Sequence, residues 1–127
     1  MLNEINIENI LFLDIETVPS SPTYEQLPEN LKRLWDKKAE WLKRSDEDTP
    51  DRLYSRAGIY AEFGKIVCIT VGFFRNNEFR LKSFFGDEEG EILTEFTKLL
   101  EDYYNTPDRF LCAHNGKEFD FPWLARR

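Results

Sequence analysis

Histidine and cysteine are scarce in this sequence, and long hydrophobic runs are missing. Among 127 residues there are one histidine and two cysteines. Cys68 and Cys112 each lie in an apolar stretch, which indicates buried thiols in a reducing compartment rather than a disulfide framework. The first ten residues carry no Lys or Arg, and no apolar run approaches membrane-spanning length. We therefore expect a cytoplasmic protein without a signal peptide or a membrane partner.

Positive charge is also in short supply. The formal net charge is −7, which argues against general binding of nucleic acid through clustered Lys and Arg. The charges are uneven, because residues 1–19 hold four acids and no Lys or Arg, whereas residues 20–58 hold eight of each sign. An enzyme that contacts phosphodiesters through metal ions tolerates an acidic sequence, since the ions supply the positive charge.

What the sequence does contain is an apolar run that ends in two carboxylates. Residues 10–17 read ILFLDIET, with Asp14 and Glu16 two positions apart. In a β-strand this spacing places both side chains on one face. Two neighbouring carboxylates on a largely buried strand repel each other unless a cation lies between them. Mg²⁺ or Mn²⁺ suits such a pair, because both ions prefer oxygen ligands.

The hydrophobic pattern predicts one α/β domain with a mixed sheet. Residues 75–77 are a turn signal between two strands, and Thr49 before Pro50 marks the start of a short helix. Three antiparallel strands, a helix and a parallel strand follow from the order of the elements. The predicted elements are a strand over 9–17, a helical insertion over 20–58, strands over 65–74 and 78–85, a helix over 88–104, a buried strand over 109–113, and a helix beginning near Asp120.

This order of elements predicts where the acids of the two motifs lie. The end of the first strand and the end of the fourth are neighbours in such a sheet, so Asp14 and Glu16 are expected to meet Asp120 at a strand-end crevice. His114 is expected to be a loop residue. The Lys-rich stretch over 32–44 is expected to be a solvated helix face, with contact to a nucleic-acid backbone as the alternative.

Most large aromatic side chains are expected in the core. The composition is 15% aromatic and includes 11 Phe, which is typical of a globular domain with many ring-bearing core residues. This expectation covers Trp35, Trp41 and Trp123, which we predict to be buried or half-buried, and the Phe pairs 73–74 and 84–85.

Two stretches resemble motifs of the DEDD superfamily of 3′–5′ exonucleases. LFLDIETVP, residues 11–19, resembles the first motif, Asp-x-Glu. AHNGKEFDFPWLARR, residues 113–127, resembles the second, in which Asn is followed by Phe-Asp and a helix. The residues of the two stretches are most similar to those of the predicted exonuclease family related to the proofreading domain of B-family DNA polymerases. The resemblance implies a ribonuclease H-like fold and two-metal hydrolysis of phosphodiesters from a 3′ end.

The resemblance also implies roles for individual residues. Asp14, Glu16 and Asp120 match the catalytic acids that hold two Mg²⁺ or Mn²⁺ ions. Thr17, Asn115 and Phe119 match positions that contact the substrate or support it. The implied partner is a nucleic acid, with DNA favoured over RNA and with single-stranded or frayed 3′ ends preferred.

One part of the family pattern is missing. The third motif, with the fourth acid, follows a further strand and helix in the superfamily, and this sequence stops at Arg127. Tyr104 and Asp108 have Tyr-x-x-x-Asp spacing but precede the second motif, so we do not assign them to it. We therefore expect residues 1–127 to be one incomplete exonuclease domain, with an exposed sheet edge available for a homodimer.

Two other functions fit parts of the sequence. A nucleic-acid-binding module of the same fold, without turnover, fits the missing fourth acid. A phosphatase of the haloacid dehalogenase type also places its first motif after an apolar strand, but that class requires Asp-x-Asp, and Glu16 counts against it.

Overall fold

The computed structural model describes residues 2–127, and the chain divides into two compact units. The first, which we call the sheet unit, comprises Met1–Glu16 and Ile66–Ala125. The second, which we call the helical unit, comprises Thr17–Lys65 and Arg126–Arg127. The helical unit contains the stretch over 20–58, which was predicted to be a helical insertion.

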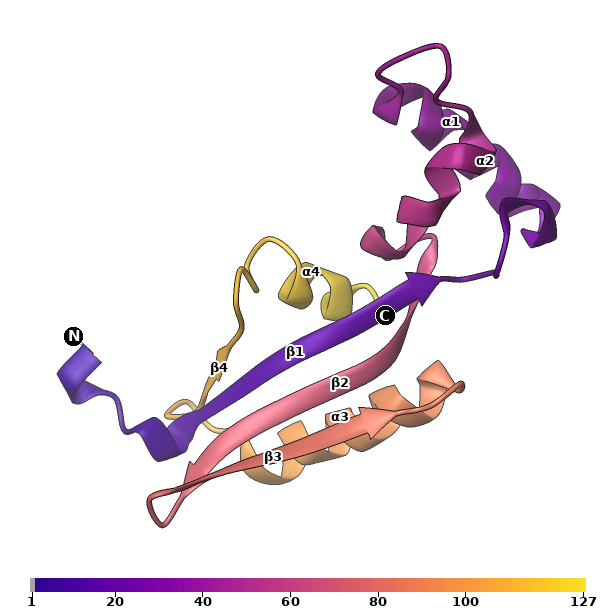
Figure 1. Ribbon diagram of the computed structural model, residues 1–127. Helices are drawn as coiled ribbons and strands as arrows, with labels where there is room; N and C mark the ends of the chain where they lie inside the picture. Colours follow the sequence, from indigo (N-terminus) through magenta and orange to yellow (C-terminus); the bar gives the residue numbers. More distant parts are fainter. Residues whose placement is uncertain (1) are drawn as a thin grey trace. The chain divides into compact units, whose positions relative to one another are not determined.

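A four-stranded mixed sheet has the strand order β3-β2-β1-β4. The first three strands are antiparallel neighbours, and β4 is parallel to β1, as predicted (Figure 1). Parallel pairing joins Ile10 to Phe110 and Phe12 to Cys112. The strands are β1 (Ile10–Pro19), β2 (Gly64–Arg75), β3 (Glu78–Phe85) and β4 (Phe110–Cys112).

The turn between β2 and β3 lies where the sequence predicts it. Asn76 and Asn77 have φ angles of 51° and 61°, so both adopt the left-handed conformation. Two consecutive left-handed residues are typical of the type I′ turn, whose twist matches that of the flanking strands. Asn tolerates this conformation better than most residues, which explains the turn signal.

The core of the sheet unit lies on one face of the sheet. Helix α3 (Glu89–Tyr103) packs against this face, and the rings of Phe84 on β3 and Phe96 on α3 meet edge to face at 6.4 Å (Figure 1). Along β1, Leu11, Leu13 and Ile15 are buried and alternate with more exposed residues. This period of two fixes which side chains of β1 point away from the core.

The other face of β3 and the β4 edge are more open than predicted. Phe85 is 77% exposed, whereas its neighbour Phe84 is buried, so the expectation of two core residues is wrong for Phe85. The strand predicted as buried over 109–113 is also exposed, with Phe110 at 46% and Leu111 at 42%. The reason is that β4 has three residues and only β1 as a neighbour.

Neither cysteine is buried as expected. Cys68 is half-buried and Cys112 is exposed, and both are free thiols. Their apolar sequence neighbours do not bury them, because Cys68 lies opposite the exposed Phe85 in the β2–β3 register and Cys112 lies on the edge strand.

The helical unit has its own core around Trp35. This side chain is fully buried, donates from Nε1 to the carbonyl oxygen of Pro50 at 2.8 Å, and meets the ring of Phe63 edge to face at 5.1 Å. Trp35 and Trp123 are therefore core residues as expected, but Trp41 is 89% exposed and that expectation is wrong. Trp41 lies on the opposite side of α1 from the buried residues.

The remaining helices are short apart from α1. The predicted short helix begins at Pro50, with Thr49 at the N-cap position, although the Thr49 side chain makes no capping hydrogen bond. The elements are α1 (Glu29–Leu42), α2 (Pro50–Leu53) and α4 (Asp120–Ala125), with 3₁₀ turns η1 (Leu2–Glu4), η2 (Ile7–Asn9), η3 (Tyr24–Gln26) and η4 (Tyr54–Ile59).

Candidate metal and nucleic-acid site

Strand β1 presents two carboxylates away from the core, as the sequence predicts. Asp14 and Glu16 are exposed, whereas Leu13 and Ile15 between and beside them are buried. Because side chains alternate along a strand, the two acids share one face of the sheet unit. Burial of the apolar side chains on the opposite face fixes this orientation.

The second acid-bearing segment is a compact loop that leads into α4. Asn115 has a φ of 52°, and its carbonyl oxygen accepts hydrogen bonds from the amides of Glu118 and Phe119 at 3.0 and 3.1 Å. The amide of Phe121 donates to the carbonyl oxygen of Gly116 at 2.8 Å. These bonds close the loop on itself and fix Asp120 as the first residue of α4.

Gly116 also positions the site, although it is not among the residues predicted to do so. A Cβ atom at this buried position would lie 2.5 Å from the Cβ of Ala113 and 2.9 Å from the ring of Phe121. Real Cβ atoms do not approach other atoms so closely, so only glycine fits. The Asn-Gly dipeptide at 115–116 is a turn signal that was present in the sequence.

Asp120 links the loop to β1. Its side chain is 2% exposed, and its Oδ1 accepts a hydrogen bond from the backbone N–H of Ile15 at 3.2 Å. Ile15 lies between Asp14 and Glu16, so this bond ties the acid of the second motif to the middle of the first, across 105 positions of sequence. A buried carboxylate with such a partner is held in one place, because an unpaired polar group in the interior is costly.

The pKa of Asp120 also reflects the nearby charge of Asp14. Burial raises the pKa of Asp120, and the nearby charge of Asp14 raises it further. The backbone hydrogen bond from Ile15 and the His114 side chain lower the same pKa, but burial prevails. His114 is an exposed loop residue, as expected.

The three residues predicted to contact substrate have separate surroundings. Thr17 belongs to the helical unit, and its hydroxyl donates to the carbonyl oxygen of Gly58 at 2.6 Å. Asn115 has an exposed side chain, and Phe119 is half-buried in the loop before Asp120. Both of these belong to the sheet unit with the three acids.

The donor chemistry of the acids suits a hard divalent cation, but their placement does not form a closed metal site. Asp14, Glu16 and Asp120 offer only carboxylate oxygens, the ligands that Mg²⁺ and Mn²⁺ prefer. Within residues 2–127, however, no group of three or more His, Cys, Asp or Glu side chains is arranged to hold a metal ion. The structure thus brings Asp14 and Asp120 near each other, and Glu16 shares only the face of β1.

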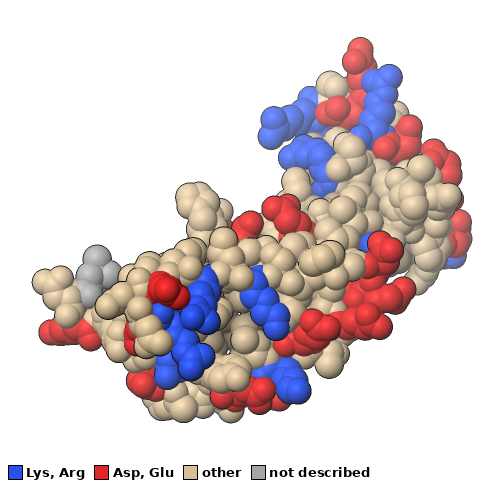
Figure 2. Space-filling model, turned by 60° about the horizontal axis from the view of Figure 1, so that its bottom comes forward, with Lys and Arg blue, Asp and Glu red and all other residues tan. Residues whose placement is uncertain are grey.

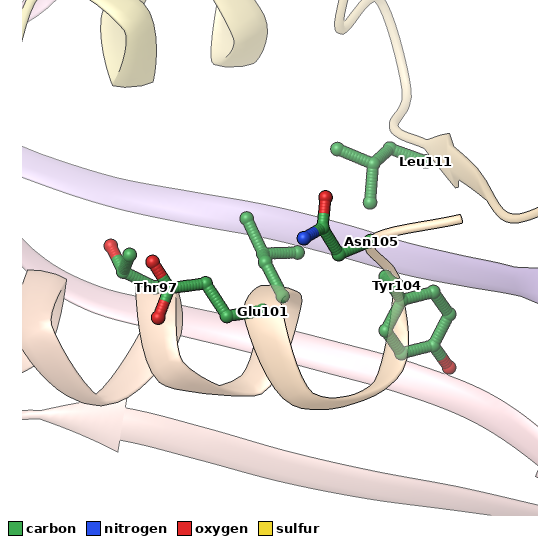
Figure 3. A pocket seen from close by; sticks show the side chains of 6 residues that line it. Thr97, Glu101, Tyr104, Asn105 and Leu111 are labelled. Carbon is green, nitrogen blue, oxygen red and sulfur yellow. The ribbon is translucent and has the colours of Figure 1, made fainter. Parts of the chain in front are cut away.

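A separate hollow lies between α3 and β4 (Figure 3). Its volume is about 350 Å³, and the residues that line it are Thr97, Leu100, Glu101, Tyr104, Asn105 and Leu111. None of the predicted site residues lines it. Burial raises the pKa of the Tyr104 hydroxyl.

Comparison of the chain with models of protein families, with curated proteins and with solved structures found no match in any of the three. Over the part of the chain that the structure describes, no helix has the length and apolar character needed to cross a membrane.

Proposed function

We propose that this chain is a metal-dependent 3′–5′ exonuclease domain of ribonuclease H-like fold that hydrolyses phosphodiester bonds at the 3′ end of DNA. The single observation that carries the proposal is the hydrogen bond from the Ile15 amide to Asp120. It joins the two segments that resemble the DEDD motifs, and it does so at the position between Asp14 and Glu16.

In the proposed reaction the three carboxylates would hold Mg²⁺ or Mn²⁺. Such ions lower the pKa of a bound water and stabilise the charge that develops at phosphorus. The contribution of the chain is to position these acids. The Ile15 amide holds Asp120, the buried side of β1 orients Asp14 and Glu16, and the closed loop around Gly116 sets the start of α4.

The test is degradation of a 5′-labelled single-stranded oligonucleotide with Mn²⁺ or Mg²⁺, and with a chelator as control. We expect products that shorten from the 3′ end only when metal is present. Asp14→Ala should lower the rate by about a hundredfold or more, because a metal ligand is lost. Asp102→Ala, which removes an exposed acid from α3, is the matched control and should leave the rate unchanged.

Hydrolysis that persists in Asp14→Ala would contradict the assignment of Asp14 as a metal ligand. Mn²⁺ binding, measured by calorimetry, gives a second readout. A folded protein that neither cleaves DNA nor binds Mn²⁺ would contradict the proposal as a whole.

One observation favours a second candidate, a nucleic-acid-binding domain of the same fold without turnover. The described residues 2–127 contain no closed cluster of metal-ligating side chains. This candidate predicts oligonucleotide binding without products, with the same affinity in Asp14→Ala and in the parental chain.

A further inference from the structure

The most exposed large apolar side chain of the described residues is on α1, in the helical unit. Trp41 is 89% exposed and Leu34 is 52% exposed. They are seven positions apart and therefore lie on the same side of the helix, two turns from each other. The core-facing side of α1 carries Trp35 and Ala39, which are buried.

Cations occupy the same outer side of α1. One acid, the exposed Glu40, also lies on this side, three positions after Lys37 and seven after Arg33. Five other exposed residues recur there at helical spacing. We call them the α1 outer stripe: Asn30, Arg33, Leu34, Lys37 and Trp41. Arg33 and Lys37 form no ion pair with any other described residue. The stripe therefore presents two solvated cations, with Glu40 beside them, near an exposed indole.

Three other cations of this region already have partners. Lys38 lies over the ring of Tyr60 at 4.4 Å, Lys32 lies over the ring of Tyr24 at 5.2 Å, and Lys43 pairs with Asp46 at 3.6 Å. These contacts are within the helical unit and account for Lys32, Lys38 and Lys43. They do not explain the outer stripe.

The charge of this stretch contrasts with that of the chain. Residues 29–44 contain six Lys or Arg and three Asp or Glu, although the whole chain has a net charge of −7. Over the part of the molecule that contains α1 and α2, several Lys and Arg side chains gather beside Asp and Glu side chains (Figure 2). An anionic partner is complementary to this surface and is repelled by much of the remainder.

We propose that the α1 outer stripe binds single-stranded nucleic acid, with a base stacked on Trp41 and backbone phosphates paired with Arg33 and Lys37. Combined aromatic stacking and cationic contact is the usual chemistry of proteins that bind single strands without sequence preference. Lys37 and Trp41 are four positions apart, a rise of about 6 Å. The inference rests on the proposed function, because the strand bound here is the strand whose 3′ end would be hydrolysed.

The stripe fits a nucleic acid better than a lipid surface. A helix that lies in a membrane interface inserts a continuous apolar face. The continuous apolar face of α1 is instead buried in the helical unit around Trp35, and the outer stripe has only Leu34 and Trp41 with Lys37 between them.

The experiment is a titration of the whole chain with oligothymidylate in the presence of a chelator, so that binding is measured without hydrolysis. Intrinsic fluorescence reports the indole directly, because Trp35 and Trp123 are buried and Trp41 is not. We expect quenching on binding, and its loss in Trp41→Ala. Anisotropy of a labelled oligonucleotide should show an affinity about tenfold weaker for Trp41→Ala, whereas Trp41→Phe should retain most of the affinity because a ring remains.

A charge variant tests the phosphate contacts. Arg33→Gln with Lys37→Gln should reduce the slope of log affinity against log salt by about 1.4, since each phosphate contact to a single strand contributes about 0.7. Arg80→Gln with Lys98→Gln is the matched control. It removes the same charge from exposed positions of the sheet unit and should leave the slope unchanged. Thermal unfolding confirms that each variant is folded.

Three results would overturn the inference: no binding of oligothymidylate by the parental chain, unchanged affinity in both stripe variants, or binding only to vesicles of phosphatidylcholine and phosphatidylglycerol. The exonuclease proposal and the α1 outer stripe proposal can fail independently of each other. Binding that depends on Trp41 without metal-dependent cleavage contradicts the exonuclease alone, and cleavage without dependence on Trp41 contradicts the stripe alone.

Discussion

At the scale of single residues, the helical unit contains a hydrogen bond that is sensitive to alkaline pH. The hydroxyl of Tyr24 donates to Oδ1 of Asp36 at 2.6 Å. This bond to an anionic acceptor, together with burial, raises the pKa of Tyr24 from 10.0 to about 12. The proton is therefore held more firmly in the folded chain than in the unfolded one.

The expected pH dependence follows from that difference. The folded pKa of Tyr24 lies above its unfolded value, so the stabilisation is fully present below pH 10.0 and is lost as the pH rises toward about 12. Tyr24→Phe should lower the free energy of unfolding by about 1 kcal/mol at neutral pH. The variant should also lack the loss of stability that deprotonation of Tyr24 causes at alkaline pH. Urea unfolding at several pH values measures the free energy of unfolding of both proteins. The same dependence of this free energy on pH in both proteins would contradict the role of Tyr24.

Gly116 is the second residue whose substitution has a definite expected outcome. An added Cβ meets Ala113 and Phe121 at distances that real structures avoid, so Gly116→Ala should destabilise the sheet unit by about 1–3 kcal/mol. Because this loop sets the position of Asp120, Mn²⁺ affinity should fall as well.

Gly90→Ala is the matched control for Gly116→Ala. A Cβ at Gly90, in the first turn of α3, meets nothing within 4 Å. Alanine there should be neutral or stabilising by up to about 1 kcal/mol, since glycine is a poor helix former. Chemical unfolding measures both variants, and equal stability of the two would remove the steric explanation for Gly116.

At the scale of elements, the sequence pattern identifies the long strands and helices well. The hairpin over β2 and β3 and the helix α3 lie where predicted, because the turn signal at 75–77 and the apolar period of α3 act locally. The pairing of β4 with β1 also follows the predicted order. The prediction that β4 is buried was wrong, because burial depends on neighbouring elements that no local sequence pattern encodes.

The helix α1 illustrates the same difference. Its existence follows from periodic apolar residues, yet its two tryptophans differ in burial: Trp35 is fully buried, and Trp41 is 89% exposed. Both are tryptophan and both lie in one helix. Only packing of the helix against Tyr54 and Phe63 decides which side faces the core.

At the scale of the whole molecule, the described chain exposes a row of large apolar side chains on one face of the sheet unit. Phe79, Leu81 and Phe85 are 50%, 68% and 77% exposed, and because even numbers of positions separate them, they lie on one face of β3. Exposed apolar patches of this kind bind hydrophobic dyes and promote association. A homodimer through the sheet edge remains a prediction from the sequence.

A paired variant tests this face. We expect the parental chain to bind 8-anilinonaphthalene-1-sulfonate while fully folded, and Leu81→Thr with Phe85→Thr to bind less. Stability should change by about 0.5 kcal/mol or less per site, because both side chains are mostly solvated. Lys82→Thr, on the opposite face of β3, is the control. Equal dye fluorescence in all three proteins would show that the face does not behave as an apolar patch.

Local residue patterns are enough to predict the α/β order of elements, the shared face of Asp14 and Glu16, and the turn at Asn76 and Asn77, because each depends on neighbours within a few positions. Two other features follow from long-range packing: the Asp120 carboxylate meets the Ile15 amide, and Trp41 is solvated. Contacts between segments about a hundred positions apart, and the choice of buried face, depend on the packing of the whole chain, which local residue patterns do not contain.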